Sequence, residues 1–229
     1  MVAGTDSDRM GFKADGRATD WREIDGFDGG FGWIAHPAET MQRASHALVV
    51  DGDVWVIDPV DAAGIDERLA AIGEVAGVVV LFDHHVRDAS AFARRHDVAV
   101  HLPRPLGSIA EDIEAPVEGF RDELADTGYV ARPVVDRFVW HEAALYSEAT
   151  GALVLADALG TVSYFLAGGE RLGVHPALRL RPPRSLAALS PERILVGHGA
   201  GIHEDAAATL SDAISGARRR LPRRSEEHT

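Results

Sequence analysis

Short apolar runs, separated by glycine, proline and acidic residues, cover most of the chain and are typical of many short strands. His46–Val50 and Val54–Ile57 are two such runs. The Asp51-Gly52 pair between them is a strong signal for a tight turn that joins two antiparallel strands. The pattern therefore predicts a β-hairpin near the start of the fold.

The next part of the chain alternates between helical and strand-like patterns. Ala62–Ile72 and Ala89–Arg95 have apolar residues at helical spacing, whereas Val78–Phe82 and Val98–His101 are continuous apolar runs of strand length. Together with the hairpin, the order is strand, strand, helix, strand, helix, strand. This order is typical of an α/β fold.

The second half follows a connector rich in glutamate and aspartate and has a similar mixture of elements. Helical material is expected after residue 156, and Asp205–Arg218 is predicted to form a closing helix. The second half therefore roughly repeats the first. Its expected strands are Val130–Val135, Phe138–Trp140, Ala143–Tyr146, Ala152–Ala156 and Arg193–Val196.

A single domain is expected over residues 31–217, because a chain of 229 residues can bury one sizeable core. Residues 1–30 are rich in aspartate and glycine, which predicts a flexible lead-in or an edge hairpin. Residues 218–229 form a tail that is first basic and then acidic. Cations at its start suit the end of a helix, so a solvated tail is favoured over a binding patch.

The amino-acid composition limits the binding partners and the cellular location that we expect for this protein. The chain carries 36 acidic and 23 basic residues, a net charge of −13, and Lys13 is its only lysine. Such an acidic surface is typical of halophilic proteins from a high-salt cytoplasm, and a genome that prefers arginine codons would also account for the missing lysines. An acidic surface argues against nucleic acid. The apolar runs are too short for a bilayer and there is no signal peptide, so we expect a cytoplasmic protein without a membrane partner.

Candidate metal ligands cluster where apolar runs end. The chain has no cysteine, so a metal ion would need histidine or carboxylate ligands. The run Val78–Phe82 is followed at once by Asp83, His84, His85, Arg87 and Asp88, and two later runs end at Asp157 and His198. Strand ends can direct several side chains into one cleft. This pattern favours a functional site at a sheet edge.

The order of these motifs resembles the metallo-β-lactamase superfamily over about residues 31–217. The resemblance implies a four-layer αββα sandwich with its site along one edge of the two sheets. The matching segments are Ile57-Asp58-Pro59, Asp83-His84-His85 with Asp88, Ala144-Leu145-Tyr146, Val154-Leu155-Ala156-Asp157 and Ile194-Leu195-Val196-Gly197-His198-Gly199.

The family motif Thr-His-x-His-x-Asp-His, which contributes to a two-metal site, is altered in this chain. In one register Asp83 replaces the first histidine, His85 keeps the second, Arg87 replaces the aspartate and Asp88 replaces the third. A register shifted by one residue would instead keep His84 as the second histidine. The first register retains more ligands and is preferred.

The later part of the resemblance implies two more metal ligands and the loss of one histidine ligand. Asp157 matches the aspartate that usually bridges two ions, His198 matches the last ligand, and Phe138 falls where the family has a histidine. A guanidinium such as that of Arg87 cannot be deprotonated to bind a metal. A site with one metal ion, or with none, fits better than a two-metal centre.

Two functions follow from this reduced site. The first is a metal-dependent hydrolase that uses one zinc, iron or manganese ion on a small-molecule substrate. The metal ligands would come from Asp83, His84, His85, Asp88, Asp157 and His198. The second is a metal-poor or metal-free binding or regulatory protein without hydrolase activity, whose affinity for its ligand depends on Arg87. Its site would be a hydrogen-bonded network of His84, His85, Arg87, Asp88, Asp157 and His198.

Overall fold

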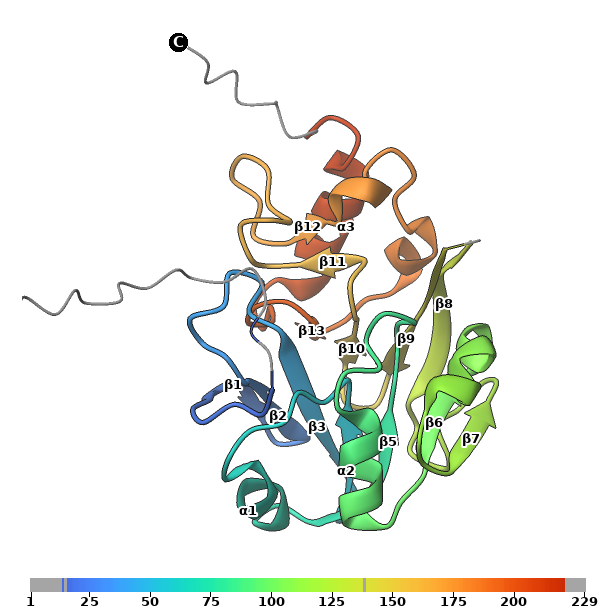
Figure 1. Cartoon of the computed structure of the whole chain (residues 1–229). Helices are drawn as coiled ribbons and strands as arrows, with labels where there is room; N and C mark the ends of the chain where they lie inside the picture. The colour runs from blue at the N-terminus through green and yellow to red at the C-terminus, as the bar shows by residue number, and fades with distance from the viewer. Residues whose placement is uncertain (1–13, 15, 138, 221–229) are drawn as a thin grey trace, which may run out of the picture.

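Two β-sheets lie face to face and helices pack on their outer faces (Figure 1). The computed structural model describes residues 14, 16–137 and 139–220. The fold is mixed α/β with the layer order αββα, as the sequence predicts. No helix in the described part of the chain is both long enough and apolar enough to cross a bilayer.

The first half of the chain builds a seven-stranded sheet in the order β1-β2-β3-β4-β5-β6-β7. Neighbouring strands from β1 to β4 are antiparallel, and those from β4 to β7 are parallel. The strands are β1 (Arg22–Phe27), β2 (Gly30–Ile34), β3 (Ala44–Val50), β4 (Asp53–Ile57), β5 (Glu74–Val79), β6 (Val100–Pro103) and β7 (Val117–Phe120).

The second half builds a four-stranded sheet in the order β13-β10-β9-β8, and a separate pair of short strands, β11 and β12. The two sheets are therefore unequal in size, although the sequence pattern of the two halves is similar. The strands are β8 (Val130–Arg137), β9 (Trp140–Ser147), β10 (Ala152–Val154), β11 (Leu159–Gly160), β12 (Gly173–Val174) and β13 (Arg193–Leu195).

Three α-helices and three short 3₁₀ helices complete the described chain. The α-helices are α1 (Ile65–Ala70), α2 (Ala89–His96) and α3 (Ala206–Gly216). The 3₁₀ helices are η1 (Arg104–Asp112), η2 (Pro176–Leu178) and η3 (Arg184–Ala188). Between β10 and β13, the expected helical material is limited to η2 and η3. These two helices follow the short strands β11 and β12.

Strand alternation explains how the layers form. Along β4, Val54 and Val56 belong to the core shared with α1 and α2, whereas Trp55 and Ile57 face the second sheet. Successive side chains of a strand point to opposite faces, so an apolar strand can be buried on both sides. Each buried valine or isoleucine contributes about 2 kcal/mol of transfer free energy.

The second sheet follows the same rule. Leu153 and Ile194 pack toward Leu210 of α3, whereas Val154 and Leu195 lie in the core between the sheets. The continuous apolar runs of the sequence are therefore strands with two buried faces. Their ends are the places where polar side chains can reach a shared edge.

The run Val78–Phe82 corrects one sequence prediction, because it is not a single strand. The strand β5 ends at Val79, and the chain then leaves the first sheet for the second. The N–H of Ala143 donates to the carbonyl of Leu81 at 2.9 Å, and Phe82 forms a bridge with Glu142. Backbone groups that leave one sheet need new partners, and β9 supplies them. This crossing brings the residues after Phe82 between the two sheets.

Candidate functional site

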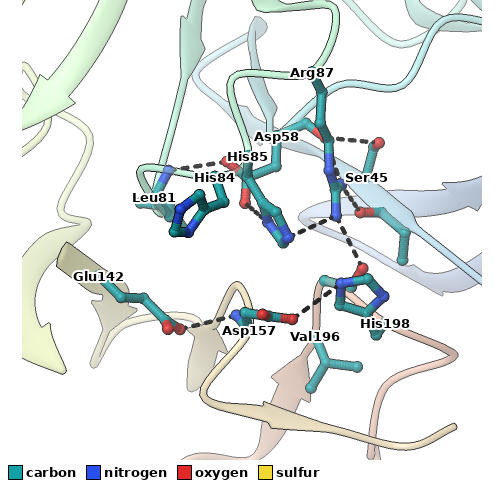
Figure 2. A network of polar contacts seen from close by, with 12 residues as sticks. Ser45, Asp58, Leu81, His84, His85, Arg87, Glu142, Asp157, Val196 and His198 are labelled. Carbon is teal, nitrogen blue, oxygen red and sulfur yellow. Dashed lines mark hydrogen bonds and ion pairs between the residues drawn. The ribbon is translucent and has the colours of Figure 1, made fainter. Parts of the chain in front are cut away.

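Three loops meet at one edge of the two sheets and enclose a cavity of about 350 Å³. His85 lies after β5, Asp157 after β10 and His198 after β13. Figure 2 shows His85 and Arg87 approaching from the first sheet, with Asp157 and His198 facing them from the second. The cavity is lined by Met41, Phe82, His84, His85, Trp140, Asp157, Tyr164, His175 and His198.

His85, Asp157 and His198 each offer one donor atom to the same small volume, and these atoms all lie within 4.8 Å of one another. The two histidines are buried, with 3% and 2% of their surfaces exposed. Two imidazoles and a carboxylate at this spacing can hold one metal ion. Among the described residues they form the one group with this geometry.

His198 has a defined tautomer. Its Nδ1 lies 2.8 Å from the carbonyl oxygen of Met41, which can only accept, so Nδ1 carries a proton. The other nitrogen, Nε2, lies 3.0 Å from Oδ1 of Asp157. The contact lacks the alignment of a hydrogen bond, and Oδ1 is buried without one. A proton on Nε2 or a metal ion must separate these two acceptor atoms.

His85 has the same tautomer for a different reason. Nη2 of Arg87, which can only donate, lies 3.2 Å from Nε2 of His85, so Nε2 accepts and Nδ1 carries the proton. Nδ1 donates to Oδ2 of Asp58 at 3.1 Å. The other carboxylate oxygen of Asp58 accepts the N–H of Leu81 at 2.9 Å. Asp58 thus orients the ring of His85 toward the cavity.

A set of backbone carbonyls holds the guanidinium of Arg87. Nη1 donates to the carbonyls of Ala44 and Asp58 at 2.6 and 2.8 Å, and Nη2 donates to that of Gly197 at 3.2 Å. These carbonyls come from three separated loops. Arg87 therefore ties the loops together while it places a positive charge beside His85.

The side chain of Glu142, on β9, holds the backbone at Asp157 in place. Its Oε1 accepts the backbone N–H groups of Asp157 and Ala158 at 3.0 and 2.9 Å. Its Oε2 accepts the indole N–H of Trp140 at 2.9 Å. The carboxyl group of this fully buried residue thus fixes the turn that presents Asp157 to the cavity.

The electrostatics of the site follow from burial and from the charges that face it. Burial raises the pKa of Glu142 to about 8, and it raises that of Asp58 to about 6 against the opposing charge of Arg87. Burial also raises the pKa of Asp157, but the contact with His198 outweighs it and holds that pKa below its usual range. Burial lowers the pKa of Arg87 to about 10, which leaves it charged at neutral pH.

The remaining candidate residues from the sequence lie around this group rather than within it. His84 lines the cavity, but 67% of its side chain is exposed, and its Nδ1 lies 3.2 Å from Asp83. Asp83 also pairs with the ring and the backbone N–H of His141. Asp88 directly precedes α2 and accepts the backbone N–H of Asp61 at 2.7 Å. The position Phe138 lies outside the described residues.

Sequence reasoning missed three residues of the site: Asp58, Glu142 and His175. Asp58 ends an apolar run, which is the same signal that pointed to Asp157. Glu142 carries the weaker signal of a carboxylate within an apolar strand. His175 lies in a segment without periodicity; its Nδ1 accepts the N–H of Ala177 at 3.2 Å, so its Nε2 carries the proton when the ring is neutral.

Comparison with known proteins identifies the fold. No family model matches the sequence, and no curated protein sequence matches it. Among solved structures, the metallo-β-lactamase DIM-1, including crystals exposed to ceftazidime, superimposes with a TM-score of 0.62 at 10–11% identity, over 88% of this chain and 100% of the other. TMB-1 superimposes with a TM-score of 0.61 at 13% identity, over 87% of this chain and 98% of the other. These similarities establish a metallo-β-lactamase fold.

Proposed function

We propose that this protein is a metal-dependent hydrolase that binds one divalent cation, with zinc as the best candidate, through His85, Asp157 and His198. The observation that carries the proposal is the contact between His198 and Asp157. Nε2 of His198 and Oδ1 of Asp157 lie 3.0 Å apart, the carboxylate oxygen is buried without a hydrogen bond, and a shared cation would bind both atoms.

The donor set suits a single catalytic ion. Zinc in catalytic sites typically has three protein ligands of nitrogen or oxygen type and one open position. Here the Nδ1–H groups of both histidines are engaged, by Asp58 and by the carbonyl of Met41, which leaves each Nε2 facing the cavity. Such partners are typical of metal-binding histidines, since they fix the ring and its tautomer. A bound ion would supply Lewis acidity and activate water.

The other residues of the cavity would bind and orient the substrate. His175 offers a proton-bearing Nε2 that can donate to an oxygen of the substrate. The rings of Phe82, Trp140 and Tyr164 form apolar walls that exclude water. A cavity of about 350 Å³ accommodates a small molecule, at the lower end of the range for ligand pockets.

A second function is favoured by one specific contact, the one between Arg87 and His85. While Nη2 of Arg87 donates to Nε2 of His85, the lone pair of that nitrogen is engaged. A metal ion at His85 would have to displace the guanidinium. If the guanidinium stays, the protein is a metal-free binding protein, and His198 contacts Asp157 directly.

Metal content separates these two functions. The protein would be purified at high salt without added metal, and its zinc, iron and manganese would be measured by mass spectrometry, before and after incubation with each ion. The proposal predicts a stoichiometric metal that is lost in Asp157→Asn and in His198→Gln. Less than about a tenth of an equivalent after incubation would overturn it, because a working site retains its ion.

His96→Gln provides the matched control for these variants. His96 also lies 3.0 Å from a carboxylate oxygen, that of Asp66, but on α2 and without a third ligand. This variant should keep the full metal content. Hydrolysis of ester, thioester, lactone and phosphodiester substrates would then be compared between the wild type and the metal-depleted variants.

A further inference from the structure

A second and larger cavity, of about 810 Å³, lies among η1, the loop after β7, and strands β8 and β9. Figure 1 shows these elements together at the side of the molecule where β6, β7 and β8 are labelled. The cavity shares no lining residue with the cleft around His85, Asp157 and His198. Its polar lining includes Arg104, Ser108, Arg121, Arg132, Asp136 and His141.

The three arginines of this cavity have no partner among the described residues, neither a carboxylate nor a backbone carbonyl. Of the sixteen other arginines in the described part of the chain, eight are paired with a carboxylate. The paired ones are Arg17, Arg43, Arg68, Arg94, Arg95, Arg179, Arg193 and Arg220, each within 4.0 Å of a carboxylate. In a protein with a net charge of −13, carboxylates are abundant, yet the three guanidiniums around this cavity have no described carboxylate within 4.0 Å.

The backbone segments that carry these arginines are held in place. Arg132 lies on β8, directly opposite Ala144 of the neighbouring strand β9. Arg121 precedes Asp122, whose carbonyl accepts the N–H of Ala131 at 2.6 Å and so attaches the loop to β8. Arg104 begins η1 directly after β6. The three cationic side chains therefore extend from fixed positions on three different elements.

His141 is a fixed polar group in the same cavity. Its Nδ1 and its backbone N–H both contact Oδ2 of Asp83, at 3.1 Å each. Its Nε2 lies 3.6 Å from Asp136, directly opposite on β8. The imidazole cannot turn without losing these contacts, so it presents one edge to the cavity.

We propose that this cavity binds a small molecule with two or more phosphate or carboxylate groups. Guanidinium groups form paired, charge-assisted hydrogen bonds with both kinds of anion. Three guanidiniums exceed the two carboxylates of the lining, those of Asp122 and Asp136, so the cavity has an excess of positive charge. The volume lies within the range of small-molecule pockets. This proposal does not depend on metal binding or hydrolysis in the first cleft.

Isothermal titration would test the proposal with tripolyphosphate and citrate as probes, one for each anion class, and with sodium chloride adjusted to equal ionic strength as the reference. We expect saturable binding of at least one probe with a stoichiometry of one. Arg121→Gln and Arg132→Gln should each weaken it about tenfold, because each removes a charge-assisted contact. The preferred probe identifies phosphate or carboxylate as the natural group.

Arg137→Gln is the matched control, because Arg137 is an exposed arginine of the same strand β8 that does not line the cavity. It should leave the affinity unchanged. All three arginines are exposed, so their substitution should leave the melting temperature of the free protein unchanged. The absence of saturable binding for both probes would overturn the proposal, as would equal losses in Arg137→Gln and Arg132→Gln, which would indicate general charge attraction.

Discussion

Nη2 of Arg87 lies 3.2 Å from Nε2 of His85, the same nitrogen that faces Asp157 and His198 across the cavity. One lone pair can serve the guanidinium or a metal ion, but not both. The carbonyls that hold Arg87 make its position favourable in the absence of metal. A metal ion bound as proposed would therefore compete with Arg87 for His85, and this competition would lower the affinity of the site.

Arg87→Gln should raise the zinc affinity about tenfold or more, because it removes a positive charge next to the ion. Arg87→Lys keeps the charge and should leave the affinity close to that of the wild type. Zinc titrations against a competing chelator would measure both. Equal affinities in all three proteins would contradict the competition. Arg87→Gln should also lose stability, since the carbonyls of Ala44, Asp58 and Gly197 lose a charged donor.

Glu142→Gln should destabilise the fold by about 1–3 kcal/mol, even though glutamine has the shape of a protonated glutamate. Glutamine can still accept the N–H groups of Asp157 and Ala158 through its oxygen. Its amide nitrogen then faces the indole N–H of Trp140, and two donors oppose each other. Urea unfolding followed by circular dichroism would measure the change.

A double variant separates this cause from a general effect of the substitution. Trp140→Phe removes the opposing indole N–H and keeps an aromatic ring. Trp140→Phe should therefore lower the free energy of unfolding less in the Glu142→Gln variant than in the wild type. This difference corresponds to a favourable coupling energy between the two substitutions. Additive losses would show that the indole contact is not the cause.

Because His46 is buried, we expect the folded protein to lose stability when the pH falls from 7 to 5. Its Nε2 donates to the carbonyl of Val196 at 3.0 Å, and its Nδ1 is buried without a partner. Burial lowers the pKa of His46 below its ordinary value, so the folded protein keeps the neutral ring. Below a pH of about 6.5 the unfolded chain takes up a proton that the folded chain does not, and the unfolded state gains stability.

The His46→Gln variant tests this dependence. Glutamine has no proton to gain in this range, so the free energy of unfolding should fall less steeply between pH 7 and 5 than in the wild type. The difference in slope cannot exceed about 1.4 kcal/mol per pH unit. His101 and His175, whose pKa values burial also lowers, remain in both proteins and cancel in the comparison. Parallel pH profiles would contradict the assignment to His46.

Arg179→Met should cost about 3–5 kcal/mol of folding free energy, because it leaves the carboxylate of Glu170 buried without its main partner. Nη2 of Arg179 lies 2.6 Å from Glu170, and the side chains are 0% and 1% exposed. Arg220 contacts the same carboxylate at 3.3 Å, which favours the lower end of this range. Chemical denaturation would measure the loss.

Arg94→Gln is the control for this pair. Arg94 lies 3.0 Å from Glu114, at nearly the same distance, but the two side chains are 52% and 83% exposed. Its loss should cost less than about 1 kcal/mol, because water screens an exposed pair. Similar losses for Arg94→Gln and Arg179→Met would show that burial does not determine how much an ion pair contributes to the folding free energy.

The mixed α/β character of this protein could be predicted from the sequence because it depends on the local spacing of apolar residues. Val54 and Trp55 are neighbours on one strand, so they must face opposite sides, and apolar residues on both sides predict a strand between two layers. The αββα arrangement itself is implied by the resemblance to the metallo-β-lactamase superfamily, and the structure confirms it. The run Val78–Phe82 shows the limit, because the crossing after Val79 depends on hydrogen bonds with β9, about sixty residues later.

The chemistry of the site depends on contacts that no local pattern contains. Apolar runs that end in His85, Asp157 or His198 indicate residues at a sheet edge, since side chains at strand ends project there. Which nitrogen of His85 carries the proton, and whether Arg87 or a metal ion occupies the other, is decided by Asp58 and by carbonyls from distant loops. Proton positions and charges at such short distances are properties of the folded arrangement. Residue types and their order are therefore readable from the chain alone, whereas their protonation and pairing arise only when the two sheets meet.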